Sequence, residues 1–418
     1  MKALINVMIV LFAFLLTACA SPEVESYQSE WTEAIDDSEI QSETVITIWT
    51  PDDVVNQSID RFKERYPAHE FVVTEIEEHE LVEHYHEAIL TDQAPDLFII
   101  PEAKAGEFAG IDGLFDLNEE PFFNQAFLDR RPDELIDRYI NDDGEMYASP
   151  IHFFPYVSYY RADLFEEAGL PSEPEDVANL IQSEEGWIKL VETMREEGRY
   201  VFESTQSLLD SALSITNAFD ETYQYVYNTD PFQKLLNRLM WIQAEGMNPN
   251  VSVWNENGQQ ALSDDKLVMF QLPTYGHDHL ARWVPEQEGK WRITDFPLGI
   301  QGFDRDTALI GAIPEASRNK TIASEMLQLI ADDLFSMHTH QYTHPFLDQD
   351  GINRLSQRLL DSDMNGKPTI LDSIARLHWE NTIYRITSGH TMDETMVQGV
   401  HNQLLDTVRN HQRILINR

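Results

Sequence analysis

Two histidine-containing clusters have side chains suited to metal coordination. In the first, the pairs His79 and Glu83, and Glu80 and His84, are each four residues apart, which would place each pair on one face of a helix. The opposite face carries apolar residues typical of a core contact: Leu81, Tyr85 and Ile89. We therefore interpret the charged side as the solvated face of a core-packed helix, with metal binding as the alternative.

The second cluster is His338, His340 and His344. These imidazoles would bind a metal only if the chain made them converge, and a polar loop explains them with fewer assumptions. No nucleophile elbow, phosphate-binding loop or dinucleotide-binding glycine motif occurs, and 73 acidic residues prevent the choice of one catalytic carboxylate pair. An enzyme is thus a weaker hypothesis than a binding protein, and no cofactor and no bound metal are expected.

The N-terminus could carry covalent lipid. Met1-Lys2 is followed by an apolar run over 4–16 that is too short for a permanent membrane span of about 20 residues. Leu16-Thr17-Ala18-Cys19 then resembles the lipobox of bacterial lipoproteins, and Cys19 is the only cysteine in the chain. We predict a signal peptide over 1–18 and lipidation of Cys19, which would anchor the protein on the extracytoplasmic face of the cell membrane. An ordinary signal peptide is the alternative.

Charge limits the possible partners. Residues 20–43 contain eight acidic residues and no Lys or Arg, which predicts a solvated acidic tether over 19–43. Across all 418 residues the net charge is −44. Nucleic acid is excluded as a partner because phosphate binding needs clustered Lys and Arg. A cationic ligand remains open, although the charge is spread along the chain.

The segments that must position any site alternate between strand and helix patterns from residue 44. Strands are expected over 44–49, 71–74 and 97–100, with amphipathic helices between them. This order predicts an α/β fold with a mostly parallel sheet. Ligands of such sheets bind beyond the carboxyl ends of the strands, where Asp52, Asp53 and Glu102 lie.

A second unit is expected to follow a strand over 147–154. Further expected elements are a helix over 183–197, a helix through 232–239, strands over 267–272 and 292–296, and a helix through 323–330. The last helix is expected to start at a capping box formed by Thr391 and Glu394.

Several short motifs, in this order, resemble the family 1 extracellular solute-binding proteins of ABC importers, the group that includes maltose-binding protein. They are the strand ending in Trp49, the segments 62–67, 94–98, 143–150 and 159–165 with Gly169, and the segments 316–320 and 388–394. The resemblance implies two α/β lobes joined by crossing strands, with a ligand cleft between them. The lobes would comprise 44–150 plus 300–336, and 151–299 plus 337–418.

The resemblance also implies a function. The protein would capture a small solute, most simply a mono- or oligosaccharide, as a monomer and deliver it to the membrane permease subunits of an ABC importer. A lipoprotein that reports the solute to a membrane sensor is the alternative, followed by a carbohydrate-active enzyme on the same fold.

Nine side chains are candidates for solute binding, from their place at strand ends or from the resemblance: Asp52, Asp53, Glu102, Phe154, Tyr156, Gln206, Tyr275, Arg376 and Trp379. For Asp52 and Asp53, capping of the following helix is an equal alternative. Three departures from the family pattern leave the identity of the solute open. Phe154 stands where the family usually has an acidic sugar ligand, Arg376 stands where it often has a stacking Trp, and residues 262–269 lack the usual Gly-Lys pair.

Overall fold

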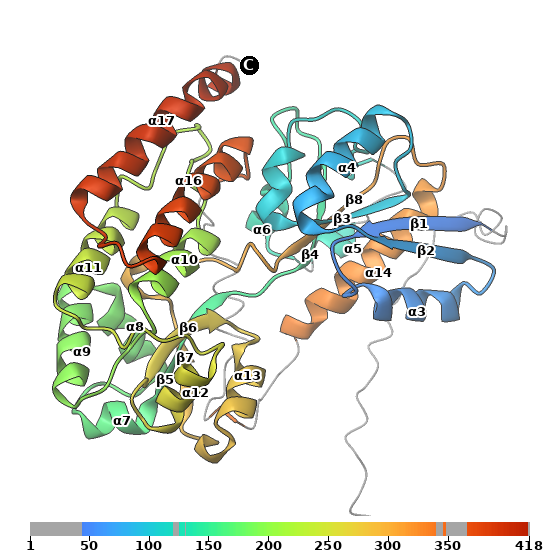
Figure 1. Cartoon of the computed structure of the whole chain (residues 1–418). Helices are drawn as coiled ribbons and strands as arrows, with labels where there is room; N and C mark the ends of the chain where they lie inside the picture. Colours follow the sequence, from blue (N-terminus) through green and yellow to red (C-terminus); the bar gives the residue numbers. More distant parts are fainter. Residues whose placement is uncertain (1–43, 120–124, 130, 340–345, 348–365, 417–418) are drawn as a thin grey trace, which may run out of the picture. The chain divides into compact units, whose positions relative to one another are not determined.

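The computed structural model describes residues 44–119, 125–129, 131–339, 346–347 and 366–416 (Figure 1). The predicted signal peptide, the predicted lipidation site Cys19 and the predicted acidic tether lie outside the described residues, as do His340, His344 and the side chain of His338.

The first sheet has five strands in the order β2-β1-β3-β8-β4. Their bounds are Val45–Thr50 (β1), Glu70–Glu75 (β2), Leu97–Pro101 (β3), Ser149–His152 (β4) and Leu309–Ala312 (β8). β1 pairs in parallel with β2 and β3, whereas β8 pairs antiparallel with β3 and β4. The strands predicted over 44–49, 71–74, 97–100 and 147–154 are confirmed.

The second sheet has three strands in the order β6-β5-β7. Their bounds are Tyr156–Arg161 (β5), Met269–Pro273 (β6) and Trp291–Thr294 (β7). β5 pairs antiparallel with both neighbours.

The mixed α/β class is confirmed, but the expectation of mostly parallel sheets is wrong. The reason is the short crossover between the sheets. Only residues 153–155 separate β4 from β5, so β5 leads away from the crossover, and β6 and β7 run back toward it. After β7 the chain returns past the crossover, where Phe303 forms a bridge with Pro155. β8 therefore runs from the crossover into the first sheet and is antiparallel to β3.

Helices cover both faces of the first sheet (Figure 1). They are α3 (Asn56–Arg65), α4 (Glu78–Leu90), α5 (Gln125–Leu128), α6 (Asp133–Asp137), α14 (Lys320–Thr339) and the 3₁₀ helix η1 (Glu102–Glu107). Alternate residues of β3 point to opposite faces. Leu97 and Ile99 join the core under α3 and α14, while Phe98 and Ile100 join the core under α4.

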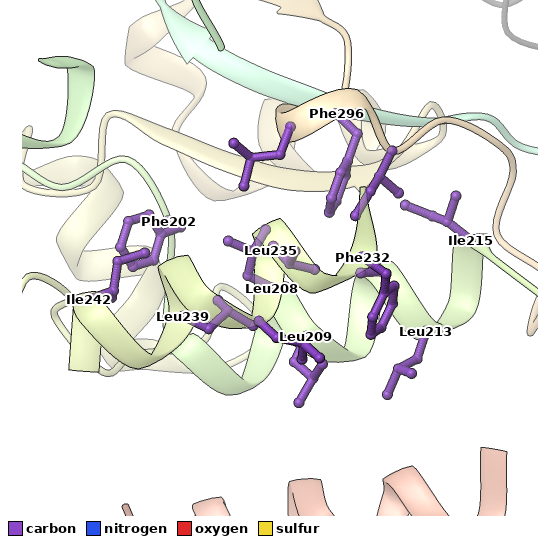
Figure 2. Close-up of a cluster of buried hydrophobic side chains, with 14 of the residues drawn as sticks. Phe202, Leu208, Leu209, Leu213, Ile215, Phe232, Leu235, Leu239, Ile242 and Phe296 are labelled. Carbon is purple, nitrogen blue, oxygen red and sulfur yellow. The ribbon is translucent and has the colours of Figure 1, made fainter. Parts of the chain in front are cut away.

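The remaining helices surround the second sheet. They are α7 (Ala162–Glu167), α8 (Pro174–Gln182), α9 (Glu184–Glu196), α10 (Thr205–Ile215), α11 (Phe232–Ala244), α12 (Glu256–Ser263), α13 (Gly276–Trp283), α16 (Ile370–Thr387), α17 (Glu394–Ile416) and the 3₁₀ helices η2 (Pro285–Gln287) and η3 (Pro297–Gly299). Figure 2 shows apolar side chains of α10 and α11 packed together beside Phe296. This core fixes the position of α10, which carries part of the site described below.

The predicted start of the last helix is wrong by two residues. α17 begins at Glu394, and Asp393 accepts a hydrogen bond from the Met396 N–H at 2.8 Å. Asp393 therefore caps the helix where Thr391 was expected to, because its carboxylate lies within reach of the third N–H of the first turn. Within the described residues, none of the helices combines the length and the apolar character needed to span a bilayer.

Candidate ligand-binding site

A polar cavity of about 340 Å³ lies beside the second sheet, where α10 and α12 begin. Its lining is dominated by amide and hydroxyl side chains and includes one half-exposed indole: Tyr156, Glu203, Ser204, Gln206, Ser207, Asp210, Ser211, Asn250, Val251, Ser252, Trp254, Asn255, Asn257, Gln271 and Leu272. The volume lies within the range of small-molecule sites, and the lining is more polar than is usual for them.

Helix α10 supplies one wall of the cavity. Ser204 caps the helix by accepting from the Ser207 N–H at 3.0 Å, and the Ser204 N–H donates to Ser207 Oγ at 3.1 Å, which completes a capping box. One face of the helix then carries the lining residues Gln206, Asp210 and Ser211, while Leu208, Leu209 and Ala212 enter the core. This split follows the helical period of 3.6 residues.

The loop that carries Trp254 supplies the opposite wall, and Glu203 holds it. The Val251 N–H donates to the Glu203 carbonyl at 3.2 Å, and the Val253 N–H donates to Glu203 Oε1 at 2.5 Å. Asn255 then caps α12 by accepting from the Gly258 N–H at 3.1 Å. With both ends of the loop fixed, the Trp254 side chain stays 52% exposed at the cavity.

A band of aromatic rings runs from the crossover to the cavity. Phe154 meets Tyr275 edge-on with ring centroids 4.9 Å apart, and Tyr275 lies 6.0 Å from His279. His279 in turn lies 4.9 Å from Trp254, which also contacts Trp283 at 5.3 Å. Edge-to-face pairs restrict ring rotation, so His279 and Trp283 help to hold the Trp254 ring in one orientation.

Burial of Glu203 changes its ionisation. Loss of water raises the pKa of this carboxyl to about 7, even though the hydrogen bonds from the Val253 N–H and the Ser252 hydroxyl lower it. The carboxyl that holds the Trp254 loop therefore keeps its proton to a higher pH than an exposed glutamate does.

A second carboxylate of the cavity wall, Asp210, is bound to an arginine. Arg376 Nη2 lies 3.0 Å from Asp210 Oδ1 and 3.1 Å from Asp306 Oδ2, and Arg376 Nε lies 3.1 Å from Glu380 Oε1. Burial raises the pKa of Asp210, Arg376 lowers it, and the other two carboxylates raise it again. The group as a whole carries more negative than positive charge.

The structure brings together five of the nine candidate residues. Tyr156 and Gln206 line the cavity, and Ser211 donates to the Tyr156 hydroxyl at 3.1 Å. Phe154 and Tyr275 form the aromatic band, and Arg376 binds the cavity residue Asp210. The roles of these five residues in binding stay predictions.

Trp379 and Glu102 have structural surroundings that differ from those expected. Trp379 is fully buried, donates from Nε1 to the Tyr225 hydroxyl at 3.3 Å and packs against the rings of Tyr227 and Phe232. Its ring has no exposed face on which a solute could stack. We therefore treat Trp379 as a core residue and do not carry it into the proposed site.

Glu102 is also fully buried. It accepts from Arg138 Nε at 2.8 Å on one carboxylate oxygen and from Arg305 Nε at 2.7 Å on the other. Both of its oxygens are occupied by arginines, so Glu102 holds chain segments together at the crossover and presents no group to a solute.

Asp52 and Asp53 are exposed at the end of β1 and do not line the cavity. Asp52 Oδ1 accepts from the Val54 N–H at 3.0 Å, and the Asp53 carbonyl accepts from the Asn56 N–H. These bonds shape the turn that leads into α3. Neither carboxylate caps the helix as the alternative expected, because the N-cap residue is Val55 and no described side chain accepts a hydrogen bond there.

Sequence reasoning missed the residues that give the cavity its character. Trp254, Asp210 and the three asparagines of the loop over 250–257 were not among the candidates. A signal was present, because Trp254 follows the alternating pair Val251 and Val253 out of phase and is itself followed by Asn255 and Asn257.

The histidines and acids of α4 are arranged as the solvated-face interpretation expects. His79 and Glu83 are exposed, and Leu81 and Tyr85 are buried. No group of three or more His, Cys, Asp or Glu side chains within the described residues is arranged to hold a metal ion.

Comparison with known proteins identifies the family. The family model described as bacterial extracellular solute-binding protein matches residues 49–326, more than half of the chain. A sequence search of curated proteins found no match.

Solved structures share the fold at low sequence identity. A protein described as an extracellular solute-binding protein of family 1 is 13% identical, with a TM-score of 0.70 over 88% of this chain and 100% of that one. The galacto-N-biose-/lacto-N-biose I-binding protein of an ABC transporter from Bifidobacterium longum is 15% identical, with a TM-score of 0.68 over 88% and 97%. The sugar-binding protein MalE from Xanthomonas citri is 16% identical, with a TM-score of 0.64 over 90% and 100%. The match to the family model and the shared two-lobed α/β fold agree with the order of motifs along the chain. The protein therefore belongs to the bacterial extracellular solute-binding protein family.

Proposed function

We propose that the protein captures a mono- or oligosaccharide in the cavity between α10 and the Trp254 loop and delivers it unchanged to an ABC importer. The observation that carries this proposal is the composition of the cavity wall. A half-exposed indole faces a space lined by primary amides and hydroxyls.

This composition suits a sugar ring for a physical reason. A pyranose has an apolar face of C–H groups that stacks on an aromatic ring, and a rim of hydroxyls that both donate and accept hydrogen bonds. Trp254 offers the ring, and side-chain amides such as Gln206 and Asn257 offer both a donor and an acceptor in one plane. An amino acid would instead require a charged pair for its carboxylate and its ammonium group.

The known ligands of fold relatives support the proposal. One neighbour is described in complex with lacto-N-biose, and another from Bifidobacterium animalis subsp. lactis, with a TM-score of 0.60 and 15% identity, in complex with β-1,6-galactobiose. These relatives are binding proteins of ABC transporters, which also supports permease subunits as partners of this chain.

We assign the two lobes to 44–150 plus 300–336 and to 151–299 plus 337–418. The cores described above support this assignment away from its boundaries, since apolar residues over 46–148 and 303–334 pack with one another, and those over 156–298 and 371–408 do likewise. At the boundaries, Ile151 and Phe153 pack with the first lobe and Ile300 packs with the second. The cavity then belongs to the second lobe, and closure of the first lobe over it would enclose the solute.

We further propose that Cys19 is lipidated and anchors the protein on the extracytoplasmic face of the membrane. The support is the sequence Leu16-Thr17-Ala18-Cys19 behind an apolar run. The native protein should partition with membranes, and Cys19→Ser should release it or leave it uncleaved. An unmodified residue 19 in the intact mass of the wild-type protein would refute the anchor.

A thermal-shift screen tests the proposed function. Neutral sugars, amino acids, polyamines and divalent metals are compared as additives to the purified protein, since a ligand of the folded state raises the melting temperature with concentration. We expect a saccharide to raise it. A rise with a polyamine or a metal and with no saccharide would overturn the assignment of a sugar.

A further inference from the structure

The charges around the cavity are of one sign. Among the described residues that line it, the ionisable carboxyls are Glu203 and Asp210, and no Lys, Arg or His is present. The remaining polar lining consists of uncharged amides and hydroxyls. A carboxylate or phosphate group of a ligand would therefore enter a space with no cation to meet it.

The arginine bound to the wall residue Asp210 already pairs with three carboxylates, and its remaining nitrogen, Nη1, is buried without a hydrogen-bond partner among the described residues. Arg376 holds Asp210, Asp306 and Glu380 through its Nη2 and Nε atoms, at distances of 3.0 to 3.1 Å. One positive charge is thus shared among three carboxylates, and it does not line the cavity. An anion that approached Arg376 would meet their repulsion first.

Two helix N-termini point to the cavity, and these could favour an anion through their partial positive charge. In both, however, a side chain already occupies the first turn. Ser204 accepts from the Ser207 N–H at 3.0 Å in α10, and Asn255 accepts from the Gly258 N–H at 3.1 Å in α12. The carboxyl of Glu203, directly before the α10 cap, opposes the remaining dipole.

We infer that the cavity selects an uncharged sugar unit and rejects uronic acid and sugar phosphate units. This inference rests on the proposed function and narrows it from sugars in general to neutral sugars. Asp210 and Glu203 are each engaged within the protein, since Asp210 pairs with Arg376 and Glu203 accepts from the Val253 N–H. The side-chain amides of the lining then favour a neutral ligand, because they donate hydrogen bonds to hydroxyl groups and accept from them while carrying no charge.

Matched sugars test the inference. Galactobiose and maltose are titrated by calorimetry at pH 7 beside digalacturonic acid and maltose 1-phosphate, with lactose, xylobiose and galactosamine as further probes. We expect at least one neutral probe to bind at least about tenfold more tightly than any acidic probe. Binding of an acidic probe equal to or tighter than that of every neutral probe would overturn the selectivity while leaving sugar binding intact. Binding of no saccharide would overturn both the proposed function and the inference.

A charge placed in the wall gives an independent test. Asn257 is exposed, lines the cavity and lies in the first turn of α12, so Asn257→Lys adds a cation there without entering the core. We expect this variant to bind digalacturonic acid about tenfold more tightly than the wild type does, and Asn257→Asp to show no such gain. Asn402→Lys adds the same charge on the exposed face of α17, outside the cavity, and is the matched control.

The outcomes are distinct. Tighter binding of digalacturonic acid by Asn257→Lys, but not by Asn402→Lys, supports the inference that the cavity excludes anions because its wall has no cation. An equal gain with Asn402→Lys would mean that the net charge of the whole protein, and not the cavity wall, excludes anions. An unchanged affinity in both variants would place the sugar elsewhere. Each of the last two results would overturn the inference.

Discussion

Replacing Glu102 with Gln should destabilise the fold strongly, because this carboxylate joins two arginines inside the protein. Glu102 is fully buried, and Arg138 and Arg305 are nearly so. In the variant, the amide group would keep one acceptor and turn its NH₂ toward an arginine N–H. Removal of one partner from a buried ion pair typically costs about 3–5 kcal/mol, because the remaining charge is left uncompensated.

The structure indicates the lower end of this range. Arg138 still donates from Nη1 to the Gly366 carbonyl at 2.6 Å and from Nη2 to Asn217 Oδ1 at 3.2 Å. Arg305 keeps a hydrogen bond to the Thr216 carbonyl at 3.2 Å and the attraction of the Asp372 carboxylate. We therefore expect a loss of about 3 kcal/mol. The 343 described residues give an unfolding entropy of about 0.7 kcal/mol/K, so the melting temperature should fall by about 4 °C.

Calorimetric and urea-induced unfolding of Glu102→Gln measure this loss. Glu107→Gln is the matched control, because Glu107 lies in the same 3₁₀ helix and is only partly buried. If both variants unfold at the same temperature and urea midpoint as the wild type, the desolvation cost of the three charges cancels their attraction, and the reasoning is refuted.

Three further predictions follow from other parts of the structure. Trp254→Ala should weaken the binding of a saccharide by about 1–3 kcal/mol, or about 5- to 150-fold in Kd, while Trp254→Phe should keep much of the affinity, as measured by calorimetry. Glu203→Gln should remove a pH dependence of the stability. The folded pKa of Glu203, about 7, exceeds the usual 4.5, so the wild type should lose about 3 kcal/mol of stability as the pH rises from about 4.5 to above 7. A constant difference in stability between the two proteins across this range would contradict the prediction. Gly106→Ala should destabilise, since its Cβ would lie 2.2 Å from the Thr369 backbone, whereas Gly399→Ala inside α17 meets nothing within 4 Å and should stabilise by about 0.5–1 kcal/mol in urea unfolding.

The early part of the fold could be predicted from sequence because its signals are local. The apolar period of 2 in β1 and of 3.6 in α3 and α4 is contained within each element, and each lies close to where it was expected. Strand direction is not local in this way. Whether β5 pairs parallel or antiparallel with β6 depends on where the chain crosses between the sheets, more than 100 residues before β6.

The candidate site shows the same division. Trp379 could have been assigned to the core from sequence, because Leu371, Ala375 and Ile383 continue its stripe at four-residue spacing. The resemblance to a family with a stacking Trp nearby outweighed that local signal. The role of Glu102 could not be predicted, since its partners Arg138 and Arg305 are 36 and 203 residues away in the chain.

The cavity itself depends on contacts of this distant kind. Glu203 lies 50 residues before Val253, whose N–H it accepts, and this bond turns the Trp254 loop toward α10. The sequence offered Tyr156 and Gln206 as candidates but gave no means of placing them beside Trp254.

The central claim is that a saccharide binds at Trp254 and leaves unchanged. Its most direct test is a titration of the purified protein with the best neutral saccharide of the screen, followed by tryptophan fluorescence and calorimetry, with the sugar recovered afterwards and analysed by mass spectrometry. We predict saturable binding with one sugar per protein, a fluorescence change that is lost in Trp254→Ala, and a recovered sugar of unaltered mass. Hydrolysed or otherwise altered sugar, or full binding in Trp254→Ala, would contradict the account.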